Sequence, residues 1–236
     1  MAVNSVKTKT GNTYDLTKAS RLYLQKGLGN EQALASVNYT DKKFILTNNV
    51  TTALLKGSVI KVENATPSLN GYWVVEAVAA NQKEIKIADT RQKTEFESDD
   101  GQTTLTLTGA KIRVVEFADY IDYATEIKTP DVSYNEIEVT STTDQSPQTV
   151  PGQPTYGDIT LTVFNAPDKE QFKLLEKYRL NKDEFVLRHV INGAIEYYFG
   201  TVTKLSGATF GTESEALKRE YTIKANDADI TLNTKA

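Results

Sequence analysis

The sequence lacks most of the side chains that carry covalent and redox chemistry. Its 236 residues include no cysteine, one methionine, one tryptophan (Trp73) and one histidine (His189). Without cysteine there is no disulfide framework, no thiolate nucleophile, no iron–sulfur cluster and no cysteine-based zinc site. A Ser–His–Asp triad would have to use His189. The composition therefore favours a protein whose function does not depend on reactive groups.

Long apolar runs and an excess of positive charge are also missing. The longest apolar runs, such as residues 72–78, are far shorter than the ~18–20 residues that span a membrane. Residues 1–10 are polar and do not resemble a signal peptide. The net charge of −4 argues against a basic surface that binds nucleic acid. We expect a soluble chain, made in the cytoplasm, with no membrane partner.

The residues that are abundant favour strands. Threonine, valine, isoleucine and tyrosine are frequent, and they suit half-buried pleated surfaces. Alternation of apolar and polar residues recurs at 58–62, 84–87, 104–108, 136–140, 158–164 and 217–223. Asn192-Gly193, between two β-rich runs at 185–191 and 194–202, predicts a hairpin with a type I′ turn. Asn70-Gly71 predicts a second hairpin within residues 59–78.

One helix is predicted at residues 168–180. Pro167 ends the preceding strand, Asp168 is placed to cap the first turn, and Gln171 completes a capping box. The apolar face that we expect to pack on a sheet consists of Phe172, Leu174, Leu175 and Tyr178. Residues 30–35 carry a weaker signal for a second, shorter helix. The predicted fold is mainly β with one flanking helix.

Residues 132–165 are the most informative segment, and they indicate a strand at 132–141, a loop at 142–157 and a strand at 158–165. A sixteen-residue polar connection is long for a compact domain, and such loops are usually functional or disordered. The loop residues that we single out are Asp144, Gln145, Pro147, Gln148, Val150, Pro151, Gln153, Pro154 and Tyr156.

The charges around this loop are one-sided. Between residues 114 and 167 there is one base, Lys128, against nine acids: Glu116, Asp119, Asp122, Glu126, Asp131, Glu136, Glu138, Asp144 and Asp158. A surface of this kind repels phosphate. Taken alone, Glu136, Glu138 and Asp158 are better explained as ordinary solvent-facing strand residues.

The order of these elements resembles that of phage major tail tube proteins. The resemblance rests on residues 136–144 (EIEVTSTTD), the polar loop with Pro151-Gly152, residues 156–162 (YGDITLT), the capped helix, the Asn-Gly hairpin and residues 199–205 (FGTVTKL) followed by 213–224. Residues 21–26 (RLYLQK) are similar to the first strand of that family.

The resemblance implies a β-sandwich or barrel with a flanking helix, related to the type VI secretion tube protein. Such subunits form rings, commonly hexameric, that stack into a virion tail tube for genome delivery. Residues 1–35 and 113–236 would form the tube domain, and residues 36–112 an inserted small β module on the outer face.

Partners and contacts are implied as well. The chain would contact itself within and between rings, and other tail proteins at the tube ends. Viral DNA would pass through the lumen without specific binding. The long loop would contact the next ring, and an acidic hairpin of Glu136, Glu138 and Asp158 would face the lumen. Assembly would take place in the cytoplasm of the host bacterium.

Other functions receive less support from the residues. His189 lies in a predicted strand, which is more typical of a structural histidine than of a base. A glycosidase-type carboxylate pair stays open because the chain has 31 acids, although no spacing nominates a pair. The acidic residues within 89–102 lack the ligand spacing of a calcium loop, which favours a solvated loop. We predict a non-enzymatic structural protein without a cofactor; the alternative is a β-sandwich surface or adhesion module that binds glycan or protein.

Overall fold

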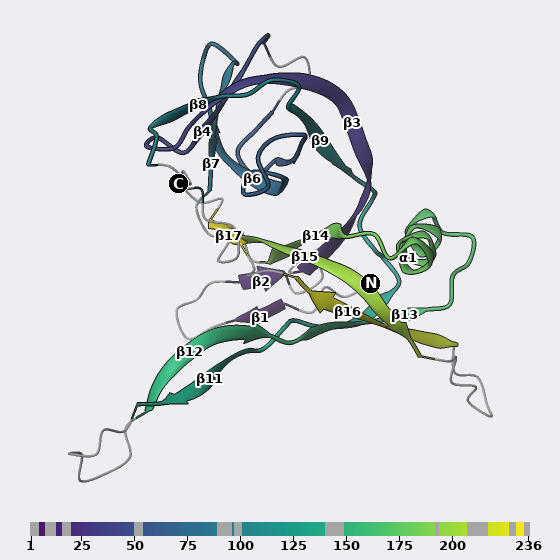
Figure 1. The fold of residues 1–236 in the computed structure, drawn as a ribbon. Helices are drawn as coiled ribbons and strands as arrows, with labels where there is room; N and C mark the ends of the chain where they lie inside the picture. The colour runs from purple at the N-terminus through teal and green to yellow at the C-terminus, as the bar shows by residue number, and fades with distance from the viewer. Residues whose placement is uncertain are drawn as a thin grey trace. The chain divides into compact units, whose positions relative to one another are not determined.

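The chain is mainly β with one α-helix in the part that the structure describes (Figure 1). The computed structural model describes residues 5–7, 13–15, 20–49, 54–88, 96, 101–139, 149–191, 194–206, 217–226 and 230–233. Two compact units are present: unit 1 comprises residues 1–121, 185–199 and 228–236, and unit 2 comprises residues 122–184 and 200–227. This division into compact units does not test whether residues 36–112 are an insertion, so the inserted module stays a prediction.

Unit 1 contains a closed antiparallel barrel. Its strands follow one another in the order β3 (Ser20–Asn38), β4 (Lys43–Leu46), β7 (Glu84–Ile87), β6 (Gly71–Val78), β5 (Val59–Glu63) and β9 (Lys111–Phe117). The ring closes because β9 pairs with β3 as well as with β5. Closure removes the free edges that would otherwise invite pairing with other chains. A short strand, β8 (Thr104–Thr106), also pairs with β3.

The barrel encloses a core of its own. Phe44, Trp73 and Phe96 meet edge to face, with ring centroids 5.2–6.1 Å apart. The Trp73 indole N–H donates to the carbonyl of Leu69 at 2.8 Å, which satisfies its one polar group. The buried members of this core all lie between Leu34 and Ile112. The stretch from β3 to β9 therefore supplies its own hydrophobic interior.

The long strand β3, drawn in purple in Figure 1, corrects the helix signal at residues 30–35. Its nineteen residues pair in turn with β14 (Phe185–Ile191), β9, β8 and β4. Register shifts against β9 fall at Gln25/Gly27 and Leu28/Glu31, where glycine-containing bulges let the strand bend. Pairing along the whole strand overrides the local helical preference.

The remaining strands of unit 1 include those of the two predicted hairpins. β14 and β15 (Ala194–Leu205) are neighbours, and residues 192–193 between them lie outside the described residues. β17 (Ile230–Asn233) pairs with the first part of β15, and β1 (Ser5–Lys7) pairs with β2 (Thr13–Asp15). The second hairpin is confirmed as the antiparallel pair β5–β6. Asn70 does not form a two-residue turn there; its side chain holds the longer connection by bonding Ala65 N–H and C=O.

Unit 2 is a sheet covered by the helix. The strand order is β10 (Ala124–Lys128), β13 (Asp158–Phe164), β16 (Lys218–Ala225) and the second part of β15. Leu161 lies opposite Tyr221 in register, and both are fully buried. The Phe172 ring on helix α1 (Glu170–Asn181) packs on Tyr221 with centroids 6.3 Å apart. The Tyr221 hydroxyl also donates to Glu176 at 2.7 Å, which anchors the helix to this face.

The helix begins two residues later than the sequence predicts. Its N-cap is Lys169, with no side-chain cap, so the predicted cap at Asp168 is wrong. A turn lies just before the helix, in which the Lys169 N–H donates to the Ala166 carbonyl. Asp168 is one of the two central residues of this turn, so it does not cap the helix. Gln171 is buried instead of closing a capping box. The helix nevertheless buries Phe172, Leu175 and Tyr178, the residues whose spacing marks its apolar face.

Candidate functional site

A two-stranded ribbon occupies much of the segment that the sequence predicts to be a loop. β11 (Val132–Glu138) pairs antiparallel with β12 (Thr149–Tyr156). The second half of the predicted loop is therefore a strand, which corrects the position of Val150, Pro151, Gln153, Pro154 and Tyr156. The other predicted loop residues, Asp144, Gln145, Pro147 and Gln148, lie outside the described residues.

Local chemistry explains why β12 forms in spite of its prolines. A two-stranded ribbon leaves one edge of each strand unpaired, and proline is accepted at an edge or a bulge. Pro154 lies opposite Tyr134 and Pro151 opposite Glu136, with a register shift between these two pairs. The β-favouring residues Thr155 and Tyr156 complete the strand.

The ribbon has two unlike faces. Ile137 lies directly opposite Val150, and Val139 follows two residues later on the same side. We call Ile137, Val139 and Val150 the apolar face; they are 50%, 48% and 43% exposed. Glu136 and Glu138 alternate with them and therefore belong to the opposite side, the acidic face, together with Tyr134.

The ribbon leaves several large apolar side chains exposed to solvent. Every side chain from Ser133 to Val139 is exposed. Half of the exposed large hydrophobic residues in the described chain lie on the ribbon, namely Tyr134, Ile137, Val139 and Val150, against Leu55, Tyr120, Phe164 and Leu180 elsewhere. A two-stranded ribbon is marginally stable alone in water, and its open edges favour pairing with other chains. These properties are typical of a segment that another molecule covers.

The predicted acidic hairpin is divided between two sheets. β11 pairs with β12, whereas β13, which carries Asp158, pairs with β10 and β16. Asp158 lies opposite Lys224, a favourable cross-strand pair. Glu136 and Glu138 are exposed, and among the described residues neither makes an ion pair. Their place in a lumen stays a prediction.

His189 has the surroundings of a structural residue. It is buried in β14 opposite Leu22, and its Nδ1 lies 3.4 Å from Glu196 Oε2 on β15. The Tyr198 hydroxyl donates to the same carboxylate at 2.6 Å. Burial lowers the pKa of His189, and Glu196 partly opposes this shift. A neutral, enclosed imidazole in mid-strand favours packing over catalysis.

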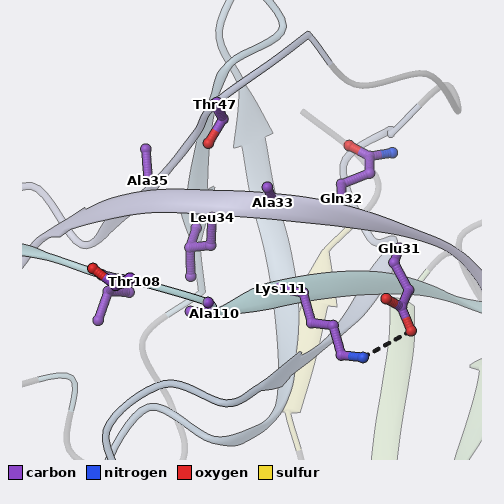
Figure 2. Close-up of a pocket in the computed structure, with 11 residues that line it drawn as sticks. Glu31, Gln32, Ala33, Leu34, Ala35, Thr47, Thr108, Ala110 and Lys111 are labelled. Atoms are coloured by element: carbon purple, nitrogen blue, oxygen red, sulfur yellow. Dashed lines mark hydrogen bonds and ion pairs between the residues drawn. The ribbon is translucent and has the colours of Figure 1, made fainter.

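A hollow of about 530 Å³ beside β3 and β9 offers no reactive group (Figure 2). Lys111 Nζ donates to Glu31 at 2.7 Å, and Arg113 bonds the same carboxylate. These hydrogen bonds lower the pKa of Glu31. The remaining lining is mostly alanine, leucine and threonine. Among the described residues, no group of three potential metal ligands comes together.

No family model matches the chain, and no curated protein matches it significantly. The resemblance to tail tube proteins therefore rests on the order of sequence elements. Within the described part of the chain, no helix is long and apolar enough to cross a bilayer.

The strongest functional feature is the ribbon. Its signal in the sequence was the alternation at residues 136–140, whose apolar members Ile137 and Val139 are exposed.

Proposed function

We propose that this chain is a structural subunit of a bacteriophage tail tube, which assembles with copies of itself into stacked rings. The observation that carries the proposal is the ribbon β11–β12 with its exposed apolar face. The mainly β fold and the helix packed on the sheet of unit 2 agree with the architecture expected from the family resemblance. Rings of six subunits are the expected form.

We expect the molecule that covers the ribbon to be a second copy of the chain. The ribbon of one subunit and its receiving surface on the next are different surfaces, so the contact is heterologous. Heterologous contacts repeat into rings or filaments, as a tube requires. Complete burial of an aliphatic side chain stabilises by about 1.5–3 kcal/mol. Because the three apolar-face residues are already half-buried, their docking contributes about half of this amount each.

The charge distribution supports passage of DNA without binding. Residues 114–167 carry nine acids and one base. Proteins that hold DNA neutralise its phosphates with lysine and arginine, and this region offers almost none. A channel built mainly from this region would repel the phosphate backbone.

The test is assembly of the purified chain at rising concentration, followed by negative-stain microscopy. Rings or filaments about 80–100 Å wide are expected, a width estimated from ring geometry. The variant Ile137→Asp with Val150→Asp should abolish them, because two carboxylates cannot be buried in an apolar contact, while circular dichroism should show that the chain is still folded.

The matched control is Leu55→Asp with Leu180→Asp, which places the same two charges at exposed leucines outside the ribbon. It should assemble like the wild type. A wild-type chain that stays monomeric at every concentration would contradict the proposal, and glycan binding by that monomer would favour a surface binding module instead.

A further inference from the structure

Two arginines in unit 1 are held against aromatic rings without an acidic partner. The Arg188 guanidinium on β14 lies between the rings of Tyr23 and Phe117, 4.3 and 4.4 Å from their centroids. The Arg21 guanidinium lies 5.3 Å from the centroid of Tyr120. We call these five residues the arginine patch. Arg21 is exposed, Tyr120 is 45% exposed and Arg188 is half-buried, so the patch is accessible mainly at Arg21 and Tyr120.

The patch is preorganised to receive carboxylates. Stacking between two rings fixes the plane of Arg188, which lowers the entropy lost when its fork binds an acid. The Arg188 Nε is buried and has no hydrogen-bond partner. Among the described residues, neither arginine makes an ion pair, although nine other lysines and arginines do. Incoming carboxylates would pair with the terminal nitrogens of the two guanidinium groups.

The acidic face of the ribbon has the complementary chemistry. Glu136 and Glu138 point to the same side of β11, so their Cα atoms are about 7 Å apart. Arg21 and Arg188 are diagonal neighbours across β3 and β14, because Tyr23 pairs with Arg188 and Val190 with Arg21. Diagonal neighbours in an antiparallel pair are about 7–8 Å apart. The two glutamates are thus spaced along their strand about as far apart as the two arginines are across theirs.

We propose that, in the assembly, the acidic face of the ribbon of one subunit docks on the arginine patch of another copy of the chain. Glu136 and Glu138 pair with Arg21 and Arg188, and Tyr134 packs against the exposed Tyr120 ring. The apolar face is then free to contact a further subunit, so neighbouring copies cover the ribbon on both sides. The inference rests on the proposed self-assembly, and it gives Glu136 and Glu138 a partner other than a channel lumen.

The experiment is a charge-reversal series on the full chain, read as the critical concentration for filament formation. Arg21→Glu with Arg188→Glu should raise it at least about tenfold, since close interfacial charge pairs are strongly coupled. Glu136→Arg with Glu138→Arg should raise it similarly. The chain with all four substitutions restores opposite charges and should assemble within about threefold of the wild type.

Controls separate folding from docking. Lys173→Glu with Lys177→Glu makes the same charge change on the exposed face of α1 and should leave assembly unchanged. Arg21→Glu alone, at an exposed position, covers the case in which Arg188→Glu prevents folding, and it should still raise the critical concentration several-fold. Circular dichroism confirms that each variant is folded.

Each outcome decides the inference. Rescue in the fourfold variant supports the contact. Loss of assembly in both double variants without rescue overturns it while the tube proposal stands. Unchanged assembly in both double variants also overturns it. Failure of the wild type to assemble overturns the proposed function itself, and the inference with it.

Discussion

At the scale of single residues, His189 makes stability depend on pH. Burial lowers the pKa of His189 in the folded chain below its ordinary value of 6.5. The unfolded chain therefore binds a proton more readily near that value, and the free energy of unfolding falls as the pH drops below about 6.5. The chain has no other histidine, so this residue dominates the window from pH 7.5 to 5.5.

The expected result is a smaller loss of stability between pH 7.5 and 5.5 in His189→Gln than in the wild type, measured by urea unfolding at both values. Glu196→Gln is the informative companion. It removes the carboxylate that partly opposes the shift, and should deepen the loss. Identical pH dependence in the wild type and His189→Gln would show that the imidazole does not titrate across folding.

Single residues also show where prediction from the sequence stops. The spacing of Phe172, Leu175 and Tyr178 is a local property, and it marks their helix face correctly. The environment of Arg188 is not local, because Tyr23 and Phe117 come from strands far away in the sequence. No residue near Arg188 in the sequence indicates that two aromatic rings lie against it.

At the scale of elements, the helix α1 provides a direct test of how unit 2 is held together. Leu175 is fully buried, whereas Leu180 on the same helix is 68% exposed. Leu175→Ala should lower the free energy of unfolding by about 2–5 kcal/mol, because it removes buried apolar volume and leaves a cavity. Leu180→Ala should change it by no more than about 0.5 kcal/mol.

Urea unfolding followed by circular dichroism measures both values. Alanine is a good helix former, so neither substitution weakens the helix itself. Equal effects of the two substitutions would mean that α1 does not pack on the sheet through Leu175.

Elements with a local signature were predictable, and those fixed by distant pairing were not. The alternation in β13 and the β-rich runs of β14 and β15 predict these strands. Residues 149–156 contain two prolines and a glycine, so their local signal is that of a loop. They form a strand because β11 pairs with them. Residues 30–35 are extended for the same reason, since β9 and β4 pair with this part of β3.

At the scale of the molecule, the barrel is attached to the rest of the chain at adjacent points. Ala33 on β3 is the register partner of Lys111 on β9, and Leu34 N–H donates to Ala110 C=O at 2.9 Å. Leu34 and Ala110 therefore stand side by side, as the two ends of a hairpin turn do. An insertion between two paired strands would have this geometry, and the inserted module at residues 36–112 stays a prediction.

Replacing residues 35–109 by Asn-Gly should accordingly join β3 and β9 into a continuous hairpin. The shortened chain loses stability, because Tyr197 and Phe199 lose the cover of Val59, Tyr72 and Val74. Each newly exposed large apolar side chain costs about 1.5–3 kcal/mol, so the free energy of unfolding should fall by several kcal/mol.

Assembly should nevertheless survive the replacement at low temperature, because the ribbon and the arginine patch lie outside residues 35–109. Negative-stain images should show filaments that are narrower than those of the full chain, as expected for a module on the outer face of the tube. Phe199→Thr in the shortened chain is the control for solubility, since it removes one exposed ring. A folded, soluble shortened chain that forms no filaments would place an assembly contact on the barrel and contradict an accessory role for it.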